Sequence, residues 1–303
     1  MQQLDLFGKP VDVFASALDR YGVWPITVWP CDMSDKYTQA LKRAIGDDPN
    51  GVMAQPRTGV SQTSDHKVGQ SRTNANPMMS TGKNSVYTPG SETHTSVFNP
   101  AVAAWLLNCY AQKGGVCLDP FAGGGTRAIM AAKHGMDYTG IELRLEEVEA
   151  VRARCANNGA GAARIIHGDA RTLADYKPGD FLLTCPPYWD LEMYEGGPGD
   201  LSMAPTYKAF LAGLEEVINA SYLALYPGSY ACWVVGLHRR ANGELLAMHH
   251  DITKLHQAAG FEFREEIILN QVNNGAIQRV GNFDKGKGHL IRTHEYAMVY
   301  RRK

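Results

Sequence analysis

The stretch Phe181-Leu-Leu-Thr-Cys-Pro-Pro-Tyr-Trp-Asp190 is the most informative part of the chain for the fold. Its first four residues have the composition of a buried strand, and two consecutive prolines follow one residue later. Because proline lacks an amide hydrogen and has a fixed φ, the pair can neither continue a strand nor begin an ordinary helix. We therefore predict a stiff, extended corner with free carbonyl groups. In open α/β sheets, ligands bind at this carboxyl end of a strand.

A second signal lies roughly sixty residues upstream, in Val116-Cys-Leu-Asp-Pro-Phe-Ala-Gly-Gly-Gly-Thr126. It reads as a short apolar strand, an acidic residue and a glycine loop that precedes a helical run. Glycines permit positive φ and a close approach of the backbone to a ligand, and the helix that follows offers free amide groups. Alone, the proline corner would also fit a simple turn covered by a packed tyrosine. Together, the two motifs favour a ligand site.

From residue 116 onward, short apolar runs alternate with amphipathic runs, which indicates a parallel sheet covered by helices. The predicted fold class is α/β, with a doubly wound, mostly parallel, Rossmann-like sheet of seven strands. The predicted strands are 116–118, 138–141, 164–167, 181–184, 230–235, 261–269 and 295–300, of which the last two form a hairpin. The predicted helices begin at Pro100 and Thr126 and cover 145–155, 210–225 and 245–259.

The chain divides in prediction into an irregular N-terminal extension, residues 1–97, and a catalytic domain, residues 98–303. Within the extension, residues 24–30 are expected to form an extended edge segment, and residues 34–45 a helix. Residues 51–97 are rich in Ser, Thr, Gly and Asn. They fit either a long loop or a segment that becomes ordered on DNA or over a cofactor.

Composition narrows the classes of function. The 303 residues carry a net charge of −1, so any contact with nucleic acid must come from local patches. The six cysteines form no Cys-x-x-Cys pair, which argues against a zinc ribbon and favours a reducing cytoplasm. The sequence predicts neither a signal peptide nor a membrane span. His249 and His250 are adjacent and expected to point apart, so no metal site is predicted.

The two motifs resemble those of the DNA amino-methyltransferases. That family has a cofactor loop Asp-Pro-Phe-x-Gly-x-Gly-Thr/Ser, matched in full by residues 119–126, and a catalytic corner (Asp/Asn/Ser)-Pro-Pro-(Tyr/Phe). The corner here, residues 185–188, departs from the pattern because Cys185 stands first. Residues 185–194 with Pro198-Gly-Asp-Leu-Ser202 look like the modification methylases of phages and prophages. The resemblance covers about residues 95–303.

The resemblance implies a class I methyltransferase fold, S-adenosylmethionine as the cofactor and double-stranded DNA as the substrate, in the cytoplasm of a bacterial or phage-infected cell. Glu142, at the end of the second strand, is expected to accept hydrogen bonds from ribose hydroxyls, and Asp169 one from the adenine amino group. Without a cofactor, Glu142 would be an ordinary carboxylate at the start of a helix, and Asp169 an ordinary turn residue. Asp119 and Gly123 would face the methionine half, and Gly125 would mainly allow close packing. The full predicted cofactor set is Asp119, Phe121, Gly123, Gly125, Thr126, Glu142 and Asp169.

The predicted catalytic residues are Cys185, Pro186, Pro187 and Tyr188. An aromatic amine is a poor nucleophile because its lone pair is delocalised into the ring. Carbonyl groups of the corner that accept hydrogen bonds from both N–H groups would free that lone pair, and Tyr188 would stack on a base that has left the duplex. Cysteine resembles the serine form of the motif, which in the family is more often associated with cytosine. The target base can be adenine or cytosine.

Three alternatives remain. Cys185 as a covalent nucleophile would methylate pyrimidine C5; the corner would also fit an RNA or protein methyltransferase; and a non-enzymatic DNA-binding protein is the third. The sequence does not determine the recognition sequence, a restriction partner or the oligomeric state.

Residues 279–303 contain seven Lys or Arg against two acidic residues. Next to a base-binding cleft, such a loop would contact phosphates, although a solvated tail has the same composition. The predicted DNA contacts are Arg279, Lys285, Lys287 and Arg292.

Overall fold

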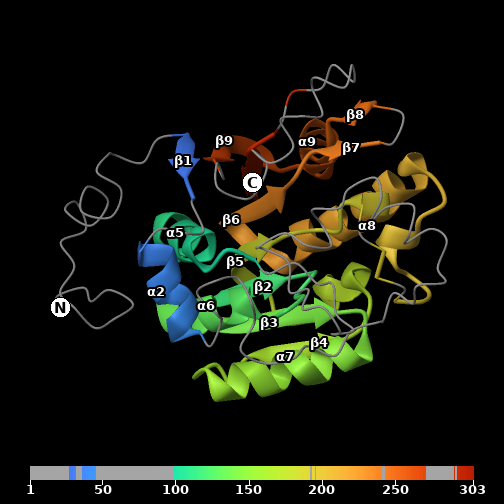
Figure 1. Cartoon of the computed structure of the whole chain (residues 1–303). Coiled ribbons are helices and arrows are strands. Elements are labelled where there is room, and N and C mark those ends of the chain that lie inside the picture. The colour runs from blue at the N-terminus through green and yellow to red at the C-terminus, as the bar shows by residue number, and fades with distance from the viewer. Residues whose placement is uncertain are drawn as a thin grey trace, which may run out of the picture.

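The computed structural model describes residues 27–31, 36–45, 98–191, 193–194, 196–240, 243–270, 290 and 292–303. Its centre is an eight-stranded sheet in the order β1-β9-β10-β6-β5-β2-β3-β4 (Figure 1). The strands are β1 (Val28–Pro30), β2 (Val116–Asp119), β3 (Asp137–Glu142), β4 (Arg164–His167), β5 (Gly179–Thr184), β6 (Leu225–Val235), β9 (Glu262–Asn270) and β10 (His294–Arg301). A separate small hairpin consists of β7 (His238–Arg239) and β8 (Leu245–Leu246).

Helices cover both faces of this sheet. They are α2 (Lys36–Ala44), α5 (Pro100–Tyr110), α6 (Thr126–His134), α7 (Leu145–Asn157), α8 (Tyr207–Ala224) and α9 (Met248–Ala259). Three short 3-10 helices, η1 (Ala170–Asp175), η2 (Trp189–Leu191) and η3 (Leu201–Met203), lie in the connections. None of the helices within the described ranges is long and apolar enough to cross a membrane.

The order of the strands reverses beside β2. From β2 the chain proceeds outward through β3 to β4, whereas β5 and β6 lie on the other side of β2, all in parallel. The predicted doubly wound sheet is therefore confirmed. The last two predicted strands, β9 and β10, pair antiparallel as expected. The reversal leaves a crevice at the carboxyl ends of β2 and β5, where ligands bind in folds of this kind.

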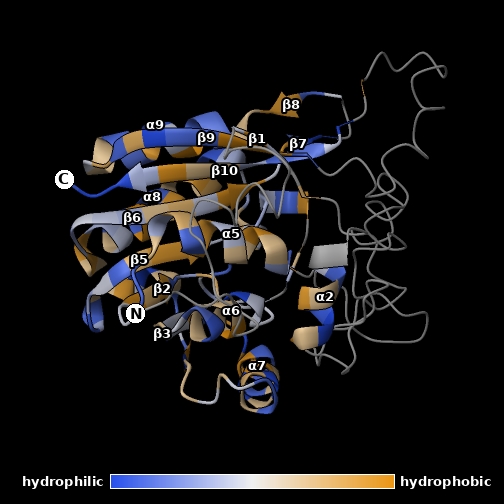
Figure 2. Ribbon diagram, turned by 90° about the vertical axis from the view of Figure 1, so that its left-hand side faces the viewer, coloured by the Kyte–Doolittle hydropathy of each residue, from blue (hydrophilic) through white to orange (hydrophobic). Residues whose placement is uncertain are grey.

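The strand residues alternate between two hydrophobic layers, as the pleat of a sheet requires. Phe181 and Leu183 face the layer built with α2, α5, α6 and α7, whereas Leu182 faces the layer built with α8 and α9. Hydropathy colouring shows apolar residues concentrated in the central strands (Figure 2). Successive residues Phe181, Leu182 and Leu183 of β5 are all buried although they face opposite layers, which explains why this run is apolar throughout instead of alternating.

Two differences between the predicted and observed boundaries concern Leu245 and Leu225. Leu245 and Leu246 belong to β8 and not to the following helix, which begins at Met248. The fifth predicted strand begins at Leu225, five residues early, because Leu225 pairs with Gly179 of β5. An apolar residue at the end of a helical stripe fits either element, so periodicity alone cannot place these boundaries.

The N-terminal region contributes an eighth strand to the sheet. β1 pairs in parallel with β9 at the sheet edge, and Trp29 stacks on Trp105 of α5 with ring centroids 4.8 Å apart. Asn99 caps α5 and also donates a hydrogen bond from Nδ2 to the Cys31 carbonyl (3.3 Å). The predicted edge segment and helix are thus observed as β1 and α2. These parts of the predicted extension pack into the same core as the catalytic fold, and residues 51–97 lie outside the described ranges.

Candidate active site

The glycine loop connects β2 to α6 at the crevice. Gly123 and Gly125 adopt φ values of 49° and 79°, in the left-handed region that favours glycine. A Cβ atom at Gly125 would stand 2.8 Å from Cγ1 of Val151 on α7. Gly125 therefore allows α6 to begin in direct contact with α7, which is the packing role predicted for it. Both glycines also line the cavity that fills the crevice.

Asp119 does not line this cavity, contrary to the prediction that it faces a cofactor. Its side chain is fully buried, and four donors already engage its two oxygens. These donors are the Phe121 amide (3.0 Å), Thr184 Oγ1 (2.6 Å), Arg127 Nε (2.6 Å) and Tyr138 Oη (2.7 Å). The carboxylate therefore joins β2, β3, β5 and α6 behind the wall of the cavity. Burial opposes the charge of Arg127, but Asp119 outweighs it and raises the pKa of the guanidinium.

Glu142 lies at the carboxyl end of β3, on the cavity wall, as predicted. Its Oε2 accepts a hydrogen bond from the Gly123 amide (3.1 Å) and its Oε1 one from the Arg144 amide (3.0 Å). A carboxylate offers about four acceptor positions, so about two remain for a ligand with adjacent hydroxyl groups. Burial raises the pKa of Glu142 above its usual value, and Arg144 counteracts this only in part.

The other predicted cofactor residues take different positions around the cavity. Asp169 and Phe121 line it, and Asp169 Oδ1 accepts from the Arg171 amide (3.0 Å) while its Oδ2 pairs with Arg171 Nη1 (3.3 Å). Thr126 also lines the cavity, but its hydroxyl accepts a hydrogen bond from Arg154 Nη1 (3.1 Å) of α7. Its contact with Arg154 ties the start of α6 to α7.

The proline corner lies at the end of β5, next to the glycine loop. Cys185, Pro186, Pro187 and Tyr188 all line the same cavity as Glu142 and Asp169. The Cys185 thiol and the Tyr188 hydroxyl are 3.3 Å apart, within hydrogen-bonding distance for sulfur. The ring of Tyr188 lies close to Gly236, which follows β6, since a Cβ atom there would stand 3.0 Å from the ring. Trp189 then adopts φ 50°, which turns the chain sharply away.

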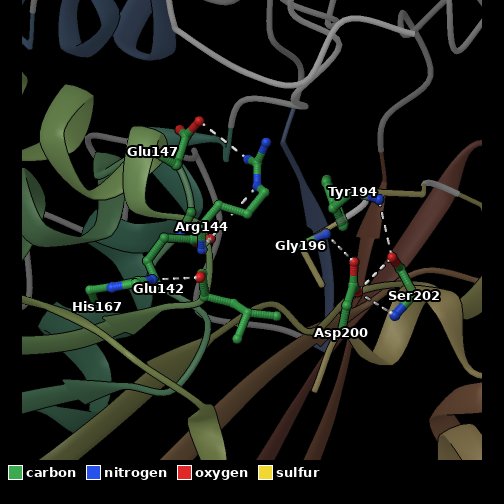
Figure 3. Close-up of polar contacts among 10 residues, drawn as sticks. Glu142, Arg144, Glu147, His167, Tyr194, Gly196, Asp200 and Ser202 are labelled. Atoms are coloured by element: carbon green, nitrogen blue, oxygen red, sulfur yellow. Dashed lines mark hydrogen bonds and ion pairs between the residues drawn. The ribbon is translucent and has the colours of Figure 1, made fainter. Parts of the chain in front are cut away.

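Among the residues of the cavity wall that sequence reasoning missed are Arg144, Tyr194 and Asp200. Arg144 follows β3 and extends its side chain between the carboxylates of Glu142 and Glu147 (Figure 3). Tyr194 and Asp200 come from the run after the proline corner. The Pro198-Gly-Asp-Leu-Ser202 motif was recognisable in the sequence, but nothing in it indicated that it packs against the residues that follow β3 and β4.

Comparison with known proteins agrees with the motifs. Residues 15–153 match the family model described as DNA methylase. The predicted resemblance to the DNA amino-methyltransferases is confirmed. Its extent differs from the prediction of about 95–303, because the matched range begins much earlier and ends before the proline corner. The resemblance to this DNA methylase family therefore includes β1 and α2. No curated protein sequence matches the chain.

Several solved structures are similar to the chain at low identity. TrmN from Thermus thermophilus is 18% identical over 68% of this chain and 49% of its own, with a TM-score of 0.47. A TehB-like SAM-dependent methyltransferase from Corynebacterium glutamicum is 15% identical over 66% and 87%, with a TM-score of 0.43. A candidate DNA modification methylase from Thermus thermophilus is 24% identical over 45% and 50%, with a TM-score of 0.34. The chain spans about half the length of the TrmN chain.

Of the predicted DNA contacts, Arg279, Lys285 and Lys287 lie outside the described residues. Arg292 is half-buried shortly before β10. Burial lowers the pKa of its guanidinium, and the nearby positive charge of Arg239 lowers it further. Two arginines thus stand close together at this side of the molecule, an arrangement that a bound anion would stabilise.

The expectation that His249 and His250 point apart is wrong. Their ring centroids are 4.0 Å apart, and together with Glu266 they place three possible ligand atoms within 4.8 Å of one another. Burial, His250 and Arg292 lower the pKa of His249 to about 4. The guanidinium of Arg292, which disfavours a proton on His249, disfavours a metal cation at the same place.

Proposed function

We propose that this protein transfers a methyl group from S-adenosylmethionine to the exocyclic amino nitrogen of a flipped adenine or cytosine in double-stranded DNA. The observation that carries the proposal is a shared cavity: the proline corner after β5 and Glu142 at the end of β3 line the same space. The proline corner would bind an aromatic amine, and Glu142 would bind a ribose. The family match over residues 15–153 supports DNA as the substrate.

The cavity fits the proposed cofactor in its donor and acceptor groups. Glu142 would accept hydrogen bonds from the two ribose hydroxyls, and Asp169 would accept one from an amino group on the adenine ring. Gly123 and Gly125 leave the loop without side chains, so that a ligand can approach the backbone. When bound, S-adenosylmethionine supplies an electrophilic methyl group on a positively charged sulfur. Asp119 would act indirectly, by fixing the loop on which Gly123 stands.

The proline corner would prepare the attacking nitrogen. Pro186 and Pro187 lack amide donors, so they cannot continue the pairing of β5, and carbonyl groups of the corner would accept hydrogen bonds from both N–H groups of the base. Such preorganised acceptors would stabilise the positive charge that grows on the nitrogen during transfer. Tyr188, which lines the cavity beside them, would stack on the base. Positioning would supply most of the rate enhancement.

Cys185 has a modest part in this proposal. Its thiol is half-buried and lies within hydrogen-bonding distance of the Tyr188 hydroxyl, so it would help to orient the aromatic ring. A serine at this position would preserve a hydrogen bond. In a C5 methyltransferase, by contrast, the thiolate would attack the pyrimidine ring directly.

DNA contacts would come from the carboxyl edge of the sheet. The positive charge of Arg239 adds to burial in lowering the pKa of Arg292, and a bound phosphate would offset that repulsion between the two guanidinium groups. Arg279, Lys285 and Lys287 remain the sequence's further candidates. The place of action would be the cytoplasm of a bacterial or phage-infected host, as part of DNA modification.

The decisive experiment is to express the protein in a host without DNA methylation and to identify modified nucleosides by mass spectrometry. N6-methyladenine or N4-methylcytosine in the DNA is the expected product. 5-Methylcytosine, or methylation confined to RNA, would overturn the proposal. Cys185→Ser should keep substantial activity. An inactive Cys185→Ser protein, together with a covalent wild-type adduct on 5-fluorocytosine DNA, would instead favour carbon methylation.

A further inference from the structure

Tyr194 and Gly196–Ser202, here called the outer segment, form the side of the cavity that faces the ends of β3 and β4. Tyr194, Gly196, Gly199, Asp200 and Leu201 line the cavity from this segment. Across from them stand Glu142 to Arg144 and Gly168 to Ala170. The proposed binding place of the adenosine half therefore lies between two walls, of which the outer one comes entirely from the chain after the proline corner.

The outer segment is held in shape by one carboxylate (Figure 3). Asp200 accepts hydrogen bonds from the Gly196 amide (2.8 Å), the Ser202 amide (2.8 Å) and the Ser202 hydroxyl (2.6 Å). The Ser202 hydroxyl oxygen in turn accepts from the Tyr194 amide (3.1 Å). These bonds close the segment on itself and fix its shape against the opposite wall.

Two glycines bring the outer segment into direct contact with that opposite wall. A Cβ atom at Gly199 would stand 2.5 Å from Oδ2 of Asp169. A Cβ atom at Gly196 would stand 3.0 Å from Cδ2 of Leu143 and 3.3 Å from Cγ of Arg144. Side chains at these positions would separate the two walls.

Arg144 connects the two walls electrostatically. Its Nη2 is 3.2 Å from Oε2 of Glu147, whose side chain is fully buried, and its Nε is 3.8 Å from Oε1 of Glu142. The guanidinium carbon lies 5.4 Å from the ring centroid of Tyr194, a cation–π arrangement. One buried cation thus contacts both the carboxylate proposed to bind ribose and the first residue of the outer segment.

We infer that the outer segment retains the adenosine half of the cofactor, and that Arg144 is the positioning residue that couples this segment to Glu142. The inference rests on the proposed function, because it takes S-adenosylmethionine as the ligand. A ligand enclosed between the walls leaves only when the outer segment separates from Leu143, Arg144 and Asp169. The contacts between the outer segment and these three residues therefore control how fast the cofactor dissociates.

The first test compares two glycine substitutions in the full chain. Gly199→Ala places its new methyl group against Asp169, whereas the methyl group of Gly197→Ala has no neighbouring atom within 4 Å. Both glycines have a positive φ, 91° and 81°. Backbone strain is therefore matched, and only contact with the opposite wall differs. Stopped-flow dissociation of S-adenosylmethionine should be about fivefold faster or more in Gly199→Ala. Gly197→Ala should dissociate at nearly the wild-type rate.

The second test concerns the ring of Tyr194. Tyr194→Ala removes the cation–π contact and should raise the dissociation rate about threefold or more, while Tyr194→Phe keeps the ring over Arg144 and should restore slow release. In turnover, KM for the cofactor should rise more than kcat falls. Equal rates within either pair of variants would overturn the inference. A wild-type protein that binds no S-adenosylmethionine would overturn the proposed function itself.

Discussion

The carboxylate of Asp119 and the guanidinium of Arg127 form an ion pair inside the molecule, with Oδ2 and Nε 2.6 Å apart and both side chains almost fully buried. Breaking a buried pair by removing one charge leaves the other uncompensated, which is strongly destabilising. This pair joins the end of β2 to α6 and fixes both ends of the glycine loop. Asp119 thus contributes to the site through the fold, and the motif position that suggests a ligand contact is structural here.

We expect Asp119→Asn to lower the free energy of unfolding by about 3 kcal/mol, because Arg127 loses its counter-charge and an amide hydrogen replaces an acceptor. Tyr138→Phe removes only one of the four hydrogen bonds and should cost about 1 kcal/mol. Urea denaturation measures both. If Asp119→Asn were as stable as the wild type but lost S-adenosylmethionine binding, Asp119 would be a ligand contact after all.

Acid should weaken cofactor binding through Glu142. Burial raises the pKa of this carboxyl above the ordinary 4.5, so it takes up a proton at a higher pH than an exposed glutamate does. Protonation removes an acceptor for the ribose hydroxyls. It does not by itself unfold the protein, because a raised pKa means that the folded state favours the neutral form. The S-adenosylmethionine affinity, measured by calorimetry, should therefore fall on acidification before circular dichroism reports unfolding.

Glu142→Gln provides the control for this pH effect. It should bind more weakly at neutral pH, since an amide accepts less strongly than a carboxylate, and its affinity should change less with pH. If the wild-type and glutamine proteins showed parallel pH profiles, another group would be responsible for the acid sensitivity.

A buried histidine should make the fold itself acid-sensitive. Burial lowers the pKa of His256 to about 3, and the ring stacks on Tyr300 at 3.7 Å between centroids. In the unfolded chain the same imidazole takes up a proton near its ordinary pKa of 6.5. Between these two values only the unfolded state binds the proton, so stability is lost as pH falls below 6.5. The loss amounts to about 1.4 kcal/mol for each pH unit.

His256→Phe should therefore flatten the dependence of unfolding free energy on pH between 7 and 5, by about 2 kcal/mol in total over that range. The aromatic ring is retained, so the stacking layer with Tyr300 remains filled. Urea denaturation at the two pH values gives the difference directly. A variant with the same acid slope as the wild type would show that His256 does not contribute to it.

The sequence predicted the sheet well because β5 and its neighbours are buried on both faces, and continuous apolar runs between helical stripes have few other interpretations. It also placed Glu142 and the proline corner correctly, since both follow directly from strand ends. In a doubly wound sheet, the carboxyl ends of the parallel strands lie along one edge, and the crevice opens there at the switch point. Local sequence is sufficient wherever the position of a residue depends only on the strand that carries it.

Prediction failed where a role depends on partners that are distant in the sequence. Nothing near Asp119 indicates that Tyr138 and Thr184 will donate to it and exhaust its acceptors. In the same way, the contact between Tyr194 and Arg144 joins residues from two separate loops. The fold brings such pairs together only after the sheet has formed, so spacing along the chain carries no signal for them.

The last prediction concerns the position of the Tyr188 ring. A methyl group at Gly236 would stand 3.0 Å from Cε2 and 3.2 Å from Cζ of this ring, so Gly236→Ala must displace the ring by a few tenths of an ångström. Because the proposed stacking requires close alignment of base and ring, kcat/KM for DNA should fall about tenfold. Binding of S-adenosylmethionine should stay close to wild type, since Gly236 is not part of the cavity wall. Gly161→Ala, whose methyl group would make only ordinary contact at 3.6 Å, is the matched control. If both variants retained full activity in a methyl-transfer assay, the placement of Tyr188 over Gly236 would have no role in catalysis, and stacking would have to come from another ring.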